Sequence, residues 1–311
     1  MREHRTVTIP TIEAGERLDA ALTRCLGISR SIITKLIDDG DITHRNKSVT
    51  KSEKVSAGQV IDVLLPEPPS DEAIPLTPLE GLHIVYNDDD IVVVDKPVGC
   101  AAHPSPGWVG PTVIGALMAA GYTITTSGPV ERTGIVHRLD AGTSGLMMVA
   151  KSDRAFLALK DMFRHRKIHK VYHALVQGHL DPAEGTIDAP IDRHPVHDHR
   201  FAVVADGKES ITHYKVIEYY RGVSMVEVEL ETGRTHQIRV HFSALGHPLV
   251  GDIIYGADPT LADSLHMPRP WLHASELHFV HPITGAQVDI STPYAPDLES
   301  SLALLSDAVL P

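Results

Sequence analysis

One acidic residue stands where a carboxylate could take part in catalysis. Residues 134–151 read GIVHRLDAGTSGLMMVAK, and a predicted strand runs into the turn that contains Asp140 while a second strand follows it. A loop between buried strands presents its side chains rigidly, and an ionised Asp there can act as a base or a nucleophile. An Asp in turn chemistry such as GTSG can also simply hydrogen-bond the backbone, which is the commoner case. From these residues alone, both roles of Asp140 stay open.

A second cluster gathers cationic and polar side chains at the start of a predicted helix. Residues 230–241 read LETGRTHQIRVH, so a strand ends at Gly233 and a helix spans 235–245, closed by Gly246. The cluster consists of Arg234, His236, Gln237 and Arg239. A helix N-terminus suits an anion such as a phosphate, and an arginine here could also pair with Asp140 and favour its ionised form. A salt-bridged surface helix would show the same pattern.

Three neighbouring histidines raise the question of a metal site. His194, His197 and His199 occur together in RHPVHDHR. Structural zinc sites usually add cysteines or a matching pair elsewhere, and the two cysteines, Cys25 and Cys100, form no CxxC. We therefore predict no metal ion. The sequence also has no phosphate-loop or Rossmann glycine pattern, which agrees with chemistry that needs no cofactor.

Hydrophobic periodicity predicts the elements that hold these clusters. The predicted strands occupy residues 82–86, 91–95, 145–150, 171–178, 211–220, 223–232, 277–280 and 288–291. Residues 153–166 have helical spacing, with Ser152 as the expected N-cap. The expected inward side of this helix is formed by Phe156, Leu159, Met162 and Phe163. Because the order is not a regular βαβ alternation, we predict an α+β domain with a mixed, mostly antiparallel sheet.

The N-terminal part is predicted to form a separate small α+β domain. Helical spacing indicates one helix from Leu18 to Leu26, ended by Gly27, and a second one capped by Ser29. The apolar side of the second helix should contain Ile32, Ile33, Leu36 and Ile37. A strand at 60–65 follows a turn-rich stretch. Two helices and a small sheet are therefore expected here.

A proline-rich segment separates this part from the rest of the chain. Residues 66–78 read PEPPSDEAIPLTP, and five prolines in this stretch exclude a helix or a central strand. We therefore expect domains at residues 1–66 and 80–311, joined by a semi-rigid linker at residues 67–79.

Charge and composition limit the possible partners. The net charge is −12, which by itself argues against nucleic acid. Residues 1–66, however, carry ten Lys and Arg against nine Asp and Glu, whereas the remainder carries 18 against 31. Basic residues such as Arg30 and Lys35 could form an RNA-binding face, or only a solvated surface. The sequence has no apolar run of membrane-spanning length and no signal peptide, and we expect a cytoplasmic protein.

The two clusters together resemble the signature motifs of the RluA-type pseudouridine synthases. HRLDAGTSGL (137–146) and TGRTHQIRVH (232–241) match two motifs, and Lys170-Val171-Tyr172 is similar to a third. The resemblance continues through GHPLVGDIIYG and LHASELHFVHPITG, and covers nearly all of residues 80–295. The N-terminal segment resembles an S4-type RNA-binding domain, which marks the ribosomal enzymes of this family. The resemblance thus implies isomerisation of uridine in structured RNA, in particular large-subunit ribosomal RNA.

The resemblance also implies roles for individual residues. Asp140 matches the catalytic aspartate, Tyr172 the tyrosine that stacks on the uracil, and Arg239 the arginine that pairs with the catalytic carboxylate. Arg138 matches the arginine that enters the RNA stack when the uridine flips out. Contacts with RNA are further expected from His137, Arg234, His236, Gln237, Arg30 and Lys35. No cofactor is implied, and a monomer is the plain expectation.

Three alternatives remain at this point. A transfer RNA could be the substrate in place of ribosomal RNA. A non-catalytic RNA-binding or ribosome-assembly factor would also carry an S4-like domain, although the intact set of Asp140, Tyr172 and Arg239 argues against it. A hydrolase that uses Asp140 with a histidine would need a nucleophile elbow or metal triad, and neither is recognisable. The first covalent step of the isomerisation is not readable from the sequence.

Overall fold

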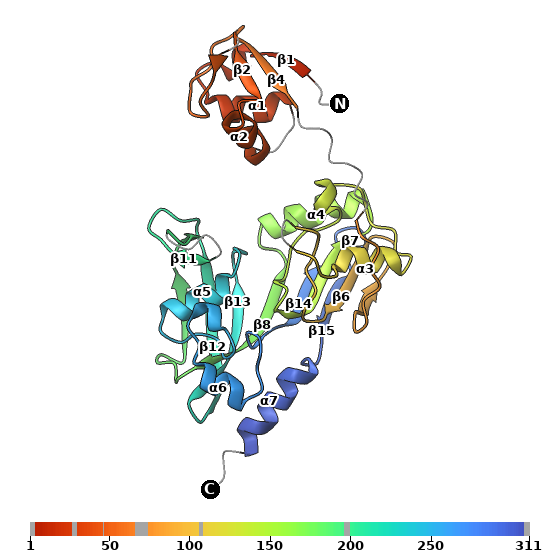
Figure 1. Ribbon diagram of the computed structural model, residues 1–311. Helices are drawn as coiled ribbons and strands as arrows, with labels where there is room; N and C mark the ends of the chain where they lie inside the picture. The colour runs from red at the N-terminus through yellow and green to blue at the C-terminus, as the bar shows by residue number, and fades with distance from the viewer. Residues whose placement is uncertain are drawn as a thin grey trace. The chain divides into compact units, whose positions relative to one another are not determined.

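The structure is a computed structural model that describes residues 4–26, 30–45, 47–65, 74–105, 108–195 and 200–307. Contacts within the chain divide it into two compact units, residues 1–73 and 74–311 (Figure 1). Within the described residues, no helix has the length and apolar character required to cross a membrane.

The first unit packs two helices on a small antiparallel sheet. The sheet has the order β1-β4-β2-β3 and consists of β1 (His4–Thr8), β2 (Ile42–His44), β3 (Lys47–Ser48) and β4 (Val60–Leu64). The predicted helices are α1 (Leu18–Leu26) and α2 (Arg30–Asp38), with a 3-10 turn at Thr11–Glu13 before them. Their apolar sides share one core with the sheet, which includes Leu22, Ile33, Leu36, Ile61 and Val63. Gly27 and Ser29, the expected helix ends, lie outside the described residues.

The second unit is built on a nine-stranded sheet. Eight strands follow the order β5-β6-β7-β14-β8-β13-β12-β9, and β15 pairs with β14. The strands are β5 (His83–Asn87), β6 (Ile91–Lys96), β7 (Ser144–Ala150), β8 (His169–Gln177), β9 (Glu184–Asp188), β12 (Ile211–Tyr220), β13 (Val223–Leu230), β14 (Leu272–Val280) and β15 (Gln287–Ser291). Among these described strands only β14 and β7 run parallel, so the predicted mixed, mostly antiparallel α+β fold is confirmed.

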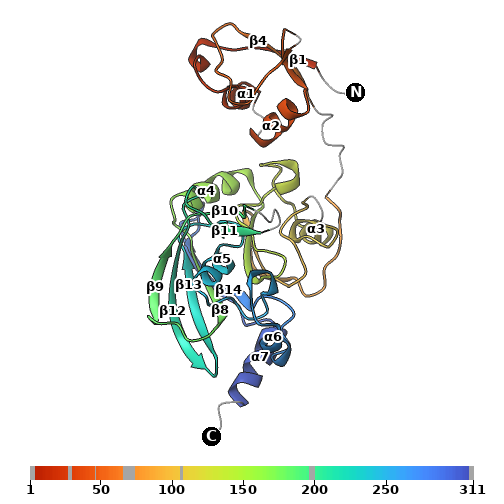
Figure 2. The same cartoon turned by 60° about the vertical axis from the view of Figure 1, so that its left-hand side comes forward.

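Helices cover this sheet and complete its core. They are α3 (Val113–Ala119), α4 (Asp153–Arg164), α5 (Gln237–Ala244), α6 (Pro259–Ser264) and α7 (Pro296–Asp307), with 3-10 turns at Val130–Arg132 and Ile253–Tyr255. A separate two-stranded ribbon pairs β10 (Ile191–Arg193) with β11 (Phe201–Val203). Figure 2 shows α5 in front of β8, β13 and β12. Its Ile238 and Phe242 pack there against Val226 and Val228 of β13.

Burial on both faces makes the strand after Asp140 rigid. All seven residues of β7 are buried, because Met147 and Val149 join the core with α3 and α5 while Leu146 and Met148 join the core with α4. The α4 helix starts as predicted, since the Ser152 hydroxyl accepts a hydrogen bond from Ala155 N. A strand buried on both faces reads as a continuous apolar run, which explains why GLMMVA was recognisable in the sequence.

The first strand predicted around Asp140 is absent. Residues 136–143 have no regular secondary structure, and Ile135 makes only an isolated bridge with Val149. Thr143 N instead donates to Asp140 O at 3.0 Å, so the segment enters β7 through a turn. Gly145 follows with φ +108°, and a Cβ there would lie 2.3 Å from Ala274 O of β14. A glycine is therefore required where β7 and β14 meet.

Candidate active site

The turn that contains Asp140 is held by an ion pair between Arg269, which is buried, and Asp297, which is partly exposed. Arg269 donates to Asp297 through Nε at 2.7 Å and Nη2 at 2.8 Å. Its Nη1 also donates to Gly142 O at 3.2 Å, and its Nη2 to Ser144 Oγ at 3.2 Å. Burial alone would raise the pKa of Asp297, but the hydrogen bonds and charge of Arg269 lower it overall. The α7 helix, which carries Asp297, thus holds the turn through Arg269 at two residues that follow Asp140, Gly142 and Ser144.

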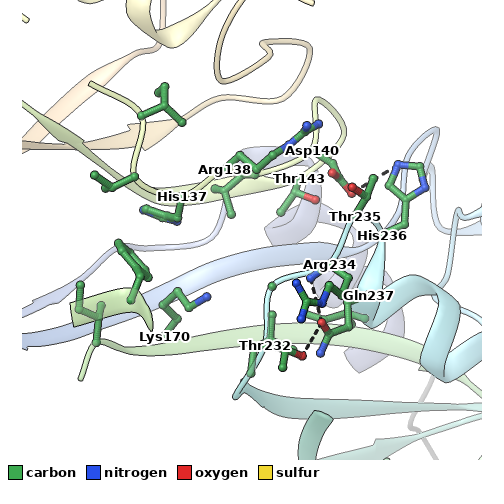
Figure 3. A pocket seen from close by; sticks show the side chains of 18 of the residues that line it. His137, Arg138, Asp140, Thr143, Lys170, Thr232, Arg234, Thr235, His236 and Gln237 are labelled. Carbon is green, nitrogen blue, oxygen red and sulfur yellow. Dashed lines mark hydrogen bonds and ion pairs between the residues drawn. The ribbon is translucent and has the colours of Figure 1, made fainter. Parts of the chain in front are cut away.

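A large cavity opens beside this turn. It has a volume of about 690 Å³, which lies in the range typical of ligand sites. Its lining includes residues 135–140, the strand residues Lys170 and Tyr172 of β8, residues 230–239 that lead from β13 into α5, and side chains of α4 (Figure 3). The structure therefore brings the two sequence clusters, about 100 residues apart in the chain, to one site.

The carboxylate of Asp140 faces two cationic or potentially cationic groups in this cavity. Its side chain is 19% exposed, and Oδ2 lies 3.7 Å from Arg239 Nη1 and 3.7 Å from His236 Nε2. Both contacts are long for hydrogen bonds, and Arg239 is the one of the two groups that places a permanent positive charge beside the carboxylate. The expected pairing of Arg239 with Asp140 is thus present as a loose contact.

The tight partner of Arg239 is a residue that the sequence did not single out. Arg239 donates to Asp252 through Nε at 2.6 Å and Nη2 at 2.8 Å, and both side chains are buried. The guanidinium also lies 4.8 Å from the centre of the Tyr255 ring. Burial lowers the pKa of Arg239, but the bonds to Asp252 outweigh it and raise the pKa overall. The guanidinium therefore binds Asp252 through Nε and Nη2, and its Nη1 faces Asp140.

His236 is held in an uncommon backbone conformation next to Asp140. Its φ of 58° is left-handed, which few residues other than glycine adopt, and it directly precedes α5. His236 Nδ1 lies 2.8 Å from Tyr255 Oη, and Tyr255 Oη accepts a hydrogen bond from Phe201 N at 3.0 Å. Burial lowers the pKa of His236, although the charge of Asp140 opposes this. His236 is therefore largely neutral near pH 7.

Tyr172 lines the same cavity from β8. The residue is 5% exposed, so little of its ring meets solvent. Burial, and then the charge of Asp140, raise the pKa of its hydroxyl, which stays protonated at neutral pH. An aromatic ring, a carboxylate and an arginine thus share one cavity.

Comparison with known proteins decides the family. The family model described as RNA pseudouridylate synthase matches residues 90–244. An uncharacterized RNA pseudouridine synthase of Mycobacterium bovis is 52% identical over 301 residues, which cover 97% of this chain and 98% of that relative. This chain belongs to the RluA-type RNA pseudouridine synthases. It is therefore an isomerase that acts on RNA.

Further relatives agree with this assignment. Ribosomal large subunit pseudouridine synthase D of Nitrosomonas europaea is 39% identical over 307 residues, covering 95% of this synthase and 86% of that protein. Among solved structures, human RNA pseudouridylate synthase domain containing 1 matches with a TM-score of 0.58 and 30% identity, over 71% of this chain and 88% of that one. The resemblance noted in the two sequence motifs is thus confirmed.

Two arginines predicted to meet RNA lie at the exposed margin of the synthase cavity. Arg138 and Arg234 are both exposed and both line the cavity. Arg234 Nε donates to Glu209 O at 3.0 Å, which orients its side chain. Lys35 is exposed on α2 of the other unit, and the side chain of Arg30 lies outside what the structure describes.

Two other predicted RNA contacts direct their hydrogen bonds into the protein. The Gln237 side chain is buried; its amide oxygen accepts from Arg234 N and Thr232 Oγ1, and its amide nitrogen donates to Ile211 O. His137 Nε2 accepts from Met148 N at 2.9 Å. These bonds shape the cavity of the synthase from within. His197 and His199 of the histidine cluster lie outside the described residues.

A buried lysine supports the turn that contains Asp140 from the side of β6. Lys96 is fully buried and donates to Pro97 O at 3.0 Å and Cys100 O at 2.8 Å. Gly99 N, within this loop, donates to Ala141 O at 2.9 Å. Burial lowers the pKa of Lys96 to about 8. The Lys-Pro pair in the sequence was a possible signal for this role, since a lysine at the end of an apolar strand needs partners when buried.

Proposed function

We propose that this synthase converts uridine to pseudouridine in large-subunit ribosomal RNA, with Asp140 as the catalytic carboxylate. The observation that carries the proposal is the position of Asp140 Oδ2, 3.7 Å from both Arg239 Nη1 and His236 Nε2 inside the cavity. Arg239 thereby places a positive charge beside the carboxylate that would carry out the chemistry.

The reaction needs an anionic group beside the ribose. It breaks the bond between C1′ and N1 of the nucleotide, rotates the uracil, and forms a bond between C1′ and C5. Asp140 can start it in two ways: its carboxylate attacks C1′, or it removes the 2′ proton so that the uracil leaves. Both routes require ionised Asp140, and Arg239 stabilises that form in each.

The other cavity residues handle the flipped base. Removing a uridine from its stack costs a few kcal/mol. The exposed guanidinium of Arg138 can fill the gap in the stack, because it is planar and stacks on bases. Tyr172 offers an aromatic surface to the uracil, and such stacking contributes about 1–3 kcal/mol per base. Bond formation at C5 also requires that the C5 proton leaves and that N1 gains a proton; because the Tyr172 hydroxyl keeps its own proton, it can relay the C5 proton but does not act as the base that takes it.

The choice of ribosomal RNA rests on relatives. Proteins named ribosomal large subunit pseudouridine synthase D from Zymomonas mobilis and Xanthomonas campestris are 38% and 36% identical over 312 and 313 residues. We further propose that residues 1–66 form an S4-like RNA-binding domain, linked by residues 67–79 to the catalytic domain at 80–311. Lys35, exposed on α2, supports this. Deleting residues 1–66 should weaken RNA binding and flatten its salt dependence.

Mapping of pseudouridine at single-base resolution in a strain that lacks the gene tests the proposed substrate. One or more uridines of large-subunit ribosomal RNA should lose the modification, and the wild-type gene should restore it. Loss confined to transfer RNA would overturn the ribosomal assignment and keep the enzyme class. We place the activity in the cytoplasm, where ribosomal RNA of a bacterial-type system is modified.

A further inference from the structure

The cavity continues along β8 beyond Tyr172. Lys170 precedes Tyr172 by two residues, so both side chains lie on the same face of the strand, about 6.6 Å apart along it. Figure 3 shows the Lys170 side chain extending from β8 into the space beneath His137, away from the Asp140–His236 pair. The proposed site of the uracil therefore has a neighbouring lobe, which we call the Lys170 lobe.

Among the residues that the structure describes, the ammonium group in this lobe has no anionic partner. Lys170 Nζ makes no hydrogen bond or ion pair with any residue in the described parts of the chain, and its nearest recorded contact is the Phe163 ring, 5.6 Å from Nζ to the ring centre. Burial lowers the pKa of Lys170 to about 8. A desolvated cation without a counter-ion is unfavourable, so binding of an anion in this lobe would be favourable.

A second donor lies on the opposite wall. His137 Nε2 accepts from Met148 N, so its ring proton is on Nδ1. Among the described residues, His137 Nδ1 is buried and has no hydrogen-bond partner. Burial, and then the charge of Lys170, lower the pKa of His137 to about 3, so the ring is neutral. The Phe163 ring, whose centre is 4.9 Å from that of His137, contacts both donors.

Charges around the lobe also favour an anion. Arg132, Lys160 and Arg164 line the cavity with exposed side chains. Two carboxylates of the lining, Glu209 and Glu231, are both paired with Arg166. The lining of the whole cavity, in which Asp140 is the third carboxylate, therefore carries more cationic than anionic side chains.

We propose that Lys170 binds a backbone phosphate of the substrate RNA next to the flipped uridine, and that His137 Nδ1 joins it when the Phe163 ring turns aside. This rests on the proposed function, because it takes Tyr172 as the place of the uracil. A phosphate fits better than a base edge, since the lobe offers donors without a free acceptor. Lys170 would hold the RNA strand in register while Asp140 acts.

The test measures the affinity for RNA as salt is varied. The probe is a labelled oligouridylate of about ten nucleotides, which requires no turnover and no knowledge of the modified uridine. Lys170→Met should lower the affinity about tenfold and reduce the slope of log affinity against log salt by about 0.7, the value of one lost phosphate contact. Lys170→Arg should retain most of the affinity and the slope. Lys167→Met, an exposed lysine outside the cavity, is the matched control.

A second probe separates phosphate from base. An abasic oligomer of the same length keeps the phosphates and removes the bases, so the Lys170→Met defect should persist on it. Thermal melting should find Lys170→Met at least as stable as wild type, because the change removes a partly buried charge that has no ion-pair partner among the described residues. Wild-type affinity and slope in Lys170→Met would overturn the proposal, as would a defect that disappears on the abasic oligomer. Neither result bears on Asp140, whose own variant tests the proposed function.

Discussion

Asp252 binds the guanidinium of Arg239 through two hydrogen bonds of 2.6 and 2.8 Å, and Nη1 of the same guanidinium points to Asp140 at 3.7 Å. Two carboxylates thus share one arginine, and they differ in the strength of their hold on it. Asp252, which is buried, fixes the orientation of Arg239. Asp140 faces the positive charge of Arg239 without a short ion pair, and in the proposed mechanism this leaves its carboxylate free to react.

Asp252→Asn should therefore impair catalysis more than RNA binding. Without the negative charge of Asp252, Arg239 can turn towards Asp140 and hold its carboxylate. We expect kcat to fall at least tenfold with KM little changed, and stability to fall by about 3 kcal/mol, because a buried ion pair is broken. Steady-state kinetics and urea denaturation measure the two effects. Asp263→Asn, at an exposed position of α6, should change neither, and a wild-type kcat in Asp252→Asn would contradict this role.

Tyr255→Phe should loosen His236 beside Asp140. The change removes the hydroxyl that bonds His236 Nδ1 and accepts from Phe201 N, while the ring stays in place over Arg239. We expect kcat to fall about tenfold and stability by about 1–3 kcal/mol, the cost of leaving buried polar groups unpaired. Tyr214→Phe, whose hydroxyl bonds Pro182 O outside the cavity, controls for loss of a hydroxyl. Loss of stability with unchanged kcat would reduce Tyr255 to a purely structural residue.

The stability of the second unit, residues 74–311, should decline as pH falls from 6.5 towards 4. Burial, and then the charge of Arg269, lower the pKa of His273 to about 4. Between that value and its unfolded pKa of about 6.5, the unfolded chain binds the proton and the folded chain does not. The contribution, on the order of 3 kcal/mol, is thus fully present above pH 6.5 and is lost as pH approaches 4.

Urea denaturation at pH 7 and pH 5 measures this effect. Both tryptophans, Trp108 and Trp271, belong to the second unit, residues 74–311, so their fluorescence measures the unfolding of that unit. His273→Gln should reduce the difference in stability between the two pH values, whereas His165→Gln, exposed at the end of α4, should not. An unchanged pH dependence in His273→Gln would show that other groups cause the acid instability.

Sequence patterns predicted the elements whose signal is local. The helix after Ser152 and the buried strand β7 carry their own caps and apolar runs, and both appear as expected. The α7 helix was not predicted, because its apolar and polar residues are not clearly separated onto two sides of the helix. Its importance lies in the contact between Asp297 and Arg269, which are far apart in the sequence. The segment before Asp140 was predicted as a strand, but pairing partners decide strand formation and it has none beyond the bridge at Ile135.

The candidate site shows the same division. The cluster around Asp140 and the cluster around Arg239 were each visible in the sequence, and the structure brings them together. Asp252 was not predicted, because it meets Arg239 only after the chain turns back beyond the end of α5, and this turn cannot be read from residue types. Gln237 looked like a polar surface residue near an anion site, yet its side chain is buried by tertiary packing. Residue type indicated polarity, and only the fold determined which partner each polar group meets.

The central claim is that the carboxylate of Asp140 performs the chemistry. The direct measurement is single-turnover formation of pseudouridine by Asp140→Asn, an isosteric variant without the charge, on a transcript of large-subunit ribosomal RNA, together with its affinity for that RNA. The account predicts that no pseudouridine forms while the affinity stays within about threefold of wild type, since loss of a group that acts only in the transition state lowers the rate and spares ground-state binding. Turnover at the wild-type rate would contradict it.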